Sequence, residues 1–159
     1  MLAWHFCKND KRLGYEDNRR IRVGETLTVE GQPVLCQHGL HGSARLIDAL
    51  RYAQGNIICR VRLGGVIVKD DDKAAASERM VLWMLNGEKL LHEFACRVAT
   101  IALTDAKVAD ERCWNAIATK RRWLRGEATD DELAAARAAA WDAARAVAGA
   151  AAGAAAGAA

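Results

Sequence analysis

The segment from residue 36 to residue 43, CQHGLHGS, concentrates the residue types that bind ligands or transfer protons. It carries His38 and His41, and imidazole changes its charge near neutral pH and coordinates metals. Gly39 and Gly42 allow a tight turn in which the backbone approaches a ligand closely. The segment therefore predicts a ligand-binding turn. The alternative is a tight turn whose histidines only satisfy nearby backbone groups.

Three further side chains complete the predicted site. His5 lies on an apolar alternation at the start of the chain, Ser43 ends the turn, and Tyr52 lies near the end of the segment that follows. The ligand-binding candidates are His5, His38, His41, Ser43 and Tyr52. A zinc site is an alternative, because Cys36, His38 and His41 form C-x-H-x-x-H and His5 or Cys7 could supply a fourth ligand. No second paired-ligand motif accompanies this one, so the sequence predicts no metal.

Strand and helix signals surround the turn. Alternating apolar residues predict strands over 2–7 and 57–63, the second continuing through 66–68. Residues 79–85 show no periodicity and could form a strand or a helix, of which we favour the strand. Residues 26–29 and 34–36, on either side of EGQP, predict a hairpin. Between these strands, Ser43 is expected to cap a helix that buries Leu46, Ile47, Leu50 and Ala53 and stops at Gly55. A long polar loop is expected over residues 8–24.

The rest of the chain is helical in pattern. Apolar residues recur at three- and four-residue steps over 90–103. Thr104 is expected to cap a second helix that ends at Gly126, and Thr129 with Glu132 forms a capping box for a third helix, rich in alanine. Segregated signals of this kind predict an α+β fold with an antiparallel or mixed sheet of about five strands in the first 85 residues, packed with C-terminal helices. The expected divisions are an α+β domain over 1–126, a capped helix over 127–148 and a flexible Ala/Gly tail over 149–159.

Basic and aromatic side chains mark two candidate surfaces for partners. The net charge of +3 is too small to indicate nucleic acid, but guanidinium groups suit acidic surfaces and phosphates. One set belongs to the strand and helix region: Arg45, Arg51, Arg60 and Arg62. The other belongs to the second C-terminal helix: Trp114, Lys120, Arg121, Arg122 and Trp123. Self-association through the Ala-rich helix, anchored by Leu133 and Trp141, is a further expectation, the alternative being that this helix packs on the helices before it.

Cysteine usage and the N-terminus bear on the compartment. The five cysteines are odd in number and lack a repeated spacing, and Met1 leads into the first strand without a basic region or a long apolar run. The Ala/Gly run after Arg145 is shorter than the ~20 residues that span a bilayer. We therefore expect a cytoplasmic protein without a membrane segment.

Two resemblances bear on function. The stretches GLHGS, ALRYA and ICRVRLGGVI, with Asp72-Lys73 as a later D-K motif, resemble uncharacterised small phage and prophage proteins with a G-[FL]-H-[AG]-S core, over roughly residues 2 to 100. This resemblance, with no complete catalytic set in the sequence, favours a non-enzymatic binding protein without a cofactor. We expect a protein partner, for instance a host enzyme or an anti-phage defence complex that it inhibits in the host cytoplasm.

More distantly, the same core resembles the ADP-ribosyltransferase fold. That resemblance implies an NAD- or nucleotide-binding protein or enzyme, with His5 and His41 lining a nicotinamide site that Ser43 and Tyr52 support. The departures are that His41 replaces an aromatic platform and that the available glutamates, Glu88 and Glu93, lie on an expected helix. Catalysis is therefore the less favoured hypothesis.

Overall fold

The computed structural model describes residues 1–14 and 17–157, with side chains as far as residue 149. It divides into two units, Met1–Glu88 and Lys89–Ala159, which we call the β unit and the helical unit. The boundary falls earlier than the one expected at residue 126, because the two helices after residue 88 group with the Ala-rich helix and not with the sheet. Strands and helices are segregated along the chain, which confirms the α+β class.

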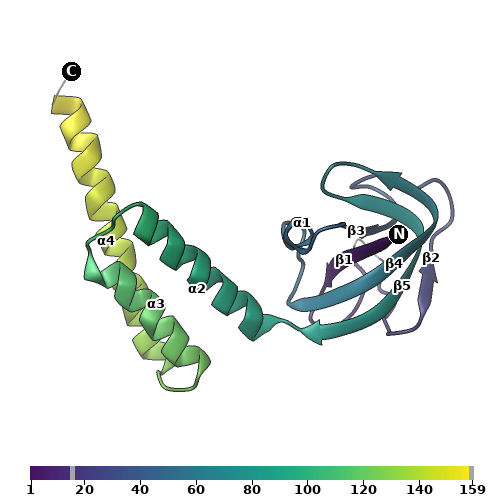
Figure 1. Cartoon of the computed structure of the whole chain (residues 1–159), viewed down its shortest axis with the longest axis horizontal. Helices are drawn as coiled ribbons and strands as arrows, with labels where there is room; N and C mark the ends of the chain where they lie inside the picture. Colours follow the sequence, from purple (N-terminus) through teal and green to yellow (C-terminus); the bar gives the residue numbers. More distant parts are fainter. Residues whose placement is uncertain (15–16, 158–159) are drawn as a thin grey trace. The chain divides into compact units, whose positions relative to one another are not determined.

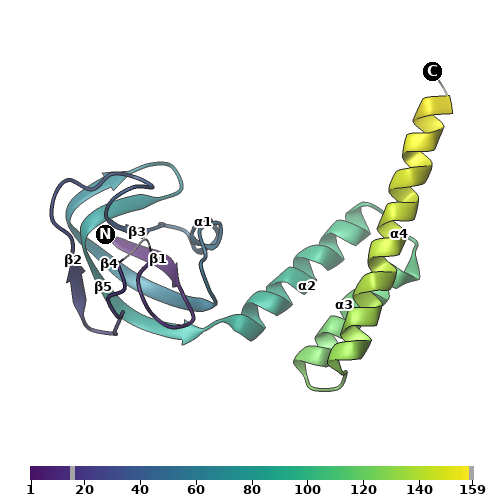
Figure 2. The same ribbon diagram turned by 180° about the vertical axis from the view of Figure 1, so that it is seen from behind.

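The β unit is built on one antiparallel sheet, which is best followed in Figures 1 and 2. Two long neighbouring strands, β4 and β5, form its middle; β1 pairs with β4, and both β2 and β3 pair with β5. The bounds are β1 Leu2–Cys7, β2 Thr26–Thr28, β3 Leu40–Gly42, β4 Ile57–Lys69 and β5 Ala74–Asn86. Asp70 to Asp72 form the turn between β4 and β5, as expected from their run of polar residues.

The sheet curls until its two ends meet. Ser43, directly after β3, pairs with Trp4 of β1 through backbone hydrogen bonds of 2.7 and 2.9 Å. Gly42 allows this contact, because a Cβ atom there would lie 3.1 Å from the Ala3 Cβ and 3.3 Å from the Trp4 carbonyl oxygen. The curled sheet encloses an apolar core that includes Ala3, Cys59, Val61, Leu63 and Val81. Burial of each large side chain of this kind contributes roughly 1.5–3 kcal/mol.

The face of strand β1 that points toward the core carries the smaller apolar side chains of the strand. Ala3 and Cys7 are fully buried in the core, and His5 lies between them on the same face, as its alternation predicted. Leu2 and Trp4 face away from the core, and Leu2 is 52% exposed. The larger apolar residues of β1 therefore lie on its outer face, where Phe6 is buried at 2% exposure.

Two local predictions for the β unit are wrong. The expected hairpin is absent from the described residues: β2 pairs with β5, and residues 34 to 38 form a turn closed by Val34 and His38. Ser43 does not cap the short helix α1, Leu46–Leu50; it is buried in the pairing with β1, and Arg45 holds the cap position without a side-chain bond. Helix α1 buries Ala49, whereas Leu46 and Ile47 are 38% and 45% exposed.

The helical unit contains α2 Glu88–Asp105, α3 Glu111–Leu124 and α4 Asp130–Gly157. The capping box is confirmed, since Glu132 accepts a bond from the Thr129 backbone and the Thr129 hydroxyl accepts one from the Glu132 backbone. Gly126, with φ of +77°, ends α3 as expected. Asp110 and not Thr104 caps α3, because α2 runs through residue 104.

Helix α4 packs along α3, as both views show (Figures 1 and 2). Its buried stripe is Leu133, Ala136 and Ala143, which includes the expected anchor Leu133. Trp141 is 67% exposed, so it does not anchor this packing. The expected flexible tail is helical as far as Gly157, and its last two residues lie outside the described range. None of the helices in the described part combines the length and hydropathy of a membrane span.

Candidate functional site

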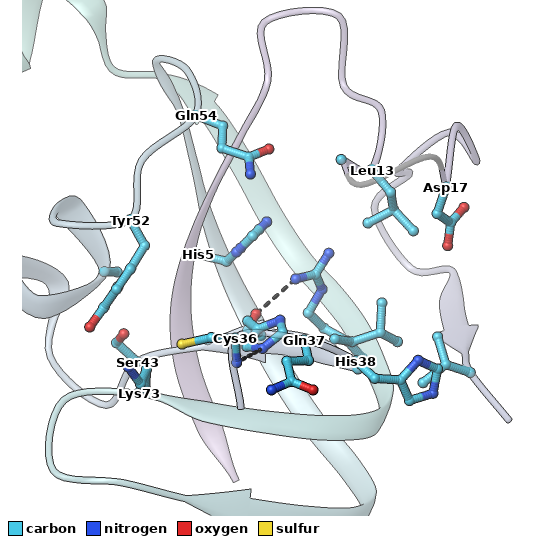
Figure 3. A pocket seen from close by; sticks show the side chains of 18 of the residues that line it. His5, Leu13, Asp17, Cys36, Gln37, His38, Ser43, Tyr52, Gln54 and Lys73 are labelled. Carbon is cyan, nitrogen blue, oxygen red and sulfur yellow. Dashed lines mark hydrogen bonds between the residues drawn. The ribbon is translucent and has the colours of Figure 1, made fainter. Parts of the chain in front are cut away.

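A cavity of about 350 Å³ opens in the β unit beside the turn from residue 36 to residue 43. All five side chains predicted to bind a ligand line it: His5, His38, His41, Ser43 and Tyr52. Figure 3 shows the labelled side chains around a central space, with Tyr52 and Asp17 on opposite sides of the view. The structure thus brings together residues that lie up to 47 positions apart, between His5 and Tyr52.

The turn that frames the cavity is held by its own backbone. Gly39 has φ of +119°, and a Cβ atom there would lie 3.3 Å from the Ala76 carbonyl oxygen, so the turn approaches β5 as only glycine permits. The backbone N–H of Cys36 donates a 3.2 Å hydrogen bond to His41 Nε2. His41 is therefore fixed with Nε2 unprotonated. On the neighbouring strand β5, Ala75 pairs with His41 and is fully buried.

Arg79, on the inward face of β5, carries the buried charge of the cavity. Its side chain is 2% exposed, and Nη1 donates a 2.8 Å hydrogen bond to the His41 carbonyl oxygen. Within the described residues, its Nε and Nη2 have no hydrogen-bond partner. Burial lowers the pKa of Arg79 to about 10, which leaves it charged at neutral pH. A buried cation with two unused donors is costly unless an acceptor is supplied.

Arg79 also governs the two inner histidines. Burial, and then the positive charge of Arg79, hold the pKa of His5 well below 6.5. The same two causes lower the pKa of His41. Both imidazoles are therefore neutral at pH 7, and the acceptor Nε2 of His41 is already used by the Cys36 backbone N–H. Arg79 supplies the charge, and the histidines supply hydrogen bonds.

The rim of the cavity is polar. The Tyr52 hydroxyl donates a 2.7 Å hydrogen bond to Asp72, and the Lys73 ammonium lies 5.3 Å from the centre of the Tyr52 ring. The pKa of Lys73 is raised by hydrogen bonds to the Cys36 thiol and to Tyr52. A second cation therefore lies at the opening, where it attracts the same ligands as Arg79.

The carboxylate of the lining is already occupied. Asp17 accepts three hydrogen bonds from the Arg19 guanidinium, the shortest 2.7 Å, and these bonds lower its pKa. Arg19 also donates to the Thr28 carbonyl oxygen, which ties the loop before β2 to the sheet. Among the described residues, no group of three His, Cys, Asp or Glu side chains lies close enough to hold a metal ion.

Sequence reasoning missed Arg79, Asp17 and Lys73. Arg79 lies two residues before Val81, so the alternation of β5 places both on one face, but the segment MVLWML shows no clear period from which to read that face. Leu82 forms a bulge that shifts the register there, since Val61 pairs with Val81 while Arg60 pairs with Trp83. The available signal for Arg79 was an arginine two residues before the apolar Val81, on the face that β5 buries.

The other predicted partner residues of the β unit lie outside the cavity lining. Arg45 and Arg51 form exposed ion pairs of 3.5 Å with Asp48 and Asp72. Arg60 and Arg62 project from the outer face of β4. Exposed pairs of this kind contribute little to stability.

The predicted partner residues of the helical unit have partners within that unit. Trp114 Nε1 donates to the Val108 carbonyl oxygen, and Trp123 Nε1 donates to Asp130. The charged members behave alike: Lys120 lies 3.7 Å over the Trp123 ring, Arg121 pairs with Glu93, and Arg122 pairs with Glu132. The contacts of Arg121, Arg122 and Trp123 with carboxylates join helices, and a partner surface here stays a prediction.

The chain belongs to the family described as Domain of unknown function (DUF7666), whose model matches residues 1–93. The match covers the β unit and the beginning of α2. The comparisons with curated proteins and with solved structures gave no match.

Proposed function

We propose that the β unit binds a small anionic ligand, held in the cavity by Arg79. The observation that carries this proposal is the unused pair of donors, Nε and Nη2, on a guanidinium that is only 2% exposed. These two nitrogens form one edge of the guanidinium, and their N–H bonds run parallel. That edge matches two oxygens of a carboxylate or a phosphate.

Other arginines of this chain use the same edge for the same purpose. Arg19, Arg112 and Arg125 each hold a carboxylate through Nε and Nη2, with Nη2 distances of 2.7 Å. Arg79 presents this edge without a carboxylate among the described residues. An anion that entered the cavity would complete the pattern.

The surroundings of Arg79 favour binding over reaction. A volume of about 350 Å³ is at the lower end of small-molecule pockets. Asp17, the described carboxylate of the lining, is committed to Arg19. A transferase needs a free carboxylate to position the ribose hydroxyl of its substrate. We therefore retain the ADP-ribosyltransferase-like alternative only as an NAD- or nucleotide-binding protein. In the phage-type hypothesis, the bound anion belongs to a host nucleotide or to an acidic side chain of a host protein.

A titration tests the proposal. Differential scanning fluorimetry of the full chain with inorganic phosphate, acetate, AMP and NAD should show a concentration-dependent rise in melting temperature with at least one anion, because a ligand of the native state stabilises it by mass action. Arg79→Met should abolish that rise, and Arg79→Lys should keep part of it.

The matched control is Arg62→Met, the same substitution on the outer face of the neighbouring strand. It should leave the anion effect unchanged. An identical rise in Arg79→Met and the unmodified chain would overturn the proposal, as would the absence of any rise at millimolar anion. A response to AMP or NAD but not to phosphate would favour the nucleotide alternative.

A further inference from the structure

The face of the sheet opposite Arg79 carries a second set of basic and aromatic side chains, some exposed and some partly buried. One of them, Trp4, is also among the residues that line the cavity. Across β1, β4 and β5, the register places Trp4, Arg60 and Trp83 in one row, because Trp4 pairs with Arg60 and Arg60 pairs with Trp83. The next row contains Leu2, Arg62 and Met80. We call these six residues the outer-face patch.

The first row is held in place by ring contacts. The Arg60 guanidinium lies 4.6 Å from the centre of the Trp4 ring, and the Trp4 and Trp83 rings meet edge to face at 5.7 Å. Arg60 Nη1 is shielded from solvent and has no hydrogen-bond partner among the described residues. An arginine that stacks on tryptophan without a carboxylate keeps an uncompensated charge in an apolar setting.

The charge of the patch is positive. Its two rows contain two arginines and no acidic residue, and neither arginine forms an ion pair within the described residues. The nearest acidic side chain along β5 is Glu78, which lies in the following row, opposite Gly64. A partner that complements this face must supply carboxylates or phosphates.

Two of the four apolar members of the patch are exposed to solvent, and Trp4 and Met80 are partly buried. Leu2 is 52% exposed and Trp83 is 40% exposed, and Leu85, in the row on the other side, is 42% exposed. Tryptophan and arginine are the residue types most enriched among the side chains that dominate the energetics of protein interfaces. A contiguous exposed apolar surface beside an aromatic cluster that is held in place is typical of an interaction surface.

We propose that the outer-face patch binds an acidic segment of a partner protein, in which a carboxylate lies next to an apolar side chain. The carboxylate complements Arg60 and Arg62, and the apolar side chain covers Trp83 and Leu2. Nucleic acid fits less well, because its affinity depends on several cations that follow the phosphate backbone. The patch has two cations, and they lie among apolar side chains.

Fluorescence anisotropy of a labelled synthetic peptide tests this directly. The probe is a peptide of about ten residues in which pairs of Glu alternate with single Leu residues. The full chain should bind it and should not bind the matched peptide with Lys in place of Glu. The double variant Arg60→Met/Arg62→Met should weaken binding at least tenfold, because it removes the complementary charge and keeps the apolar area.

Two matched variants separate this surface from other features. Arg45→Met/Arg51→Met removes the same charge from exposed ion pairs elsewhere in the β unit and should leave the affinity unchanged. Arg79→Met should also leave it unchanged, so this proposal and the cavity proposal fail independently. Far-UV circular dichroism confirms folding of each variant. Equal binding of the Glu and Lys peptides, tighter binding of an oligo-dT strand of equal length, or no loss in the double variant would overturn the proposal.

Discussion

Several arginines of the helical unit pair with carboxylates of the same unit, whereas two arginines of the β unit keep shielded nitrogens without a described partner. In the helical unit, the guanidinium groups pair with carboxylates at 2.7 to 3.6 Å: Arg112, Arg121, Arg122 and Arg125. In the β unit, Arg79 and Arg60 each retain shielded nitrogens without a described partner. The paired arginines hold helices and turns together, so their role is complete within the fold.

The unpaired arginines carry a cost that folding alone does not offset. A shielded donor without an acceptor costs on the order of 1–3 kcal/mol, and more when it is charged. A protein that keeps two such groups on opposite faces of one sheet gains from them only when another molecule supplies the acceptors. This contrast supports the proposal that the β unit binds an anion, and a partner surface on the helical unit stays a prediction.

The substitutions with the largest expected effect disrupt each unit separately. Val61→Asp places a carboxylate in the fully buried core of the β unit, beside Cys59 and Leu63, and should destabilise that unit by more than about 4 kcal/mol. Leu133→Asp, at a site 4% exposed in the helical unit, should melt the packing of α4 on α3. Circular dichroism and the anion titration are the measurements.

The two variants should give opposite results. Val61→Asp should abolish the anion effect while much of the helical signal remains, and Leu133→Asp should keep the anion effect. If Leu133→Asp also abolished anion binding in a β unit that still melts cooperatively, binding would not belong to the β unit alone.

A smaller test compares one unpaired arginine with one paired arginine. Arg79→Met removes a buried charge that lacks acceptors and should raise the free energy of unfolding of the ligand-free protein, by roughly 1–3 kcal/mol. Arg121→Met breaks the ion pair with Glu93 and should lower it by no more than about 1 kcal/mol. Urea denaturation without added anion measures both. A marked loss of stability in Arg79→Met would show that its bond to the His41 carbonyl outweighs the unused donors.

The pH dependence follows from the inner histidines. The folded state lowers the pKa of His5 and His41, so below pH 6.5 the unfolded chain binds more protons than the folded one. The free energy of unfolding should therefore fall as the pH drops from 6.5 through the lowered pKa values. A bound anion favours the protonated imidazoles, so its affinity should rise over the same range.

Melting curves from pH 5 to 8, with and without phosphate, measure both effects. Each histidine contributes at most about 1.4 kcal/mol per pH unit. His5→Gln should flatten the decline in the ligand-free protein and weaken the pH dependence of anion binding. A stabilising effect of phosphate that did not change with pH would exclude protonation of His5 on binding.

The comparison also explains which features were readable from the sequence. The alternation over residues 57–63 and the capping box at Thr129 and Glu132 are local patterns, and each was predicted correctly. The glycine-rich segment was expected to form a turn throughout, whereas residues 40–42 form strand β3. The five candidate residues line one cavity, and three of them were singled out because histidines and glycines cluster in residues 36–43. Local chemistry was enough for these features.

The features that depend on long-range pairing were not readable. The hairpin over residues 26–36 was wrong because β2 and β3 both pair with β5, some 50 and 35 residues later in the chain. Ser43 was assigned to a helix cap because its local context fits one, whereas closure of the sheet against Trp4 uses it instead. Arg79 was missed because the register shift in β5 hides the alternation that places it inside.

The smallest expected effect concerns the rate at which one thiol reacts. Cys36 is exposed and lines the cavity, whereas Cys7, Cys59 and Cys96 are buried. Iodoacetamide should therefore alkylate Cys36 first. An anion in the cavity blocks that approach, so at ten times its dissociation constant it should slow the reaction up to about tenfold, in proportion to the sites left free. Cys113, partly buried in the helical unit, is the internal control and should react at an unchanged rate.

The charge of the reagent sharpens this measurement. Iodoacetate carries the carboxylate that we expect Arg79 and Lys73 to attract, and iodoacetamide has nearly the same size without the charge. The ratio of the two alkylation rates at Cys36 should be several-fold higher in the unmodified chain than in Arg79→Met, and Cys113 should show no such change. Mass spectrometry of peptides containing each cysteine gives the rates. A ratio that is the same at both cysteines and in both proteins would mean that the cavity does not concentrate anions, even if its shape admits them.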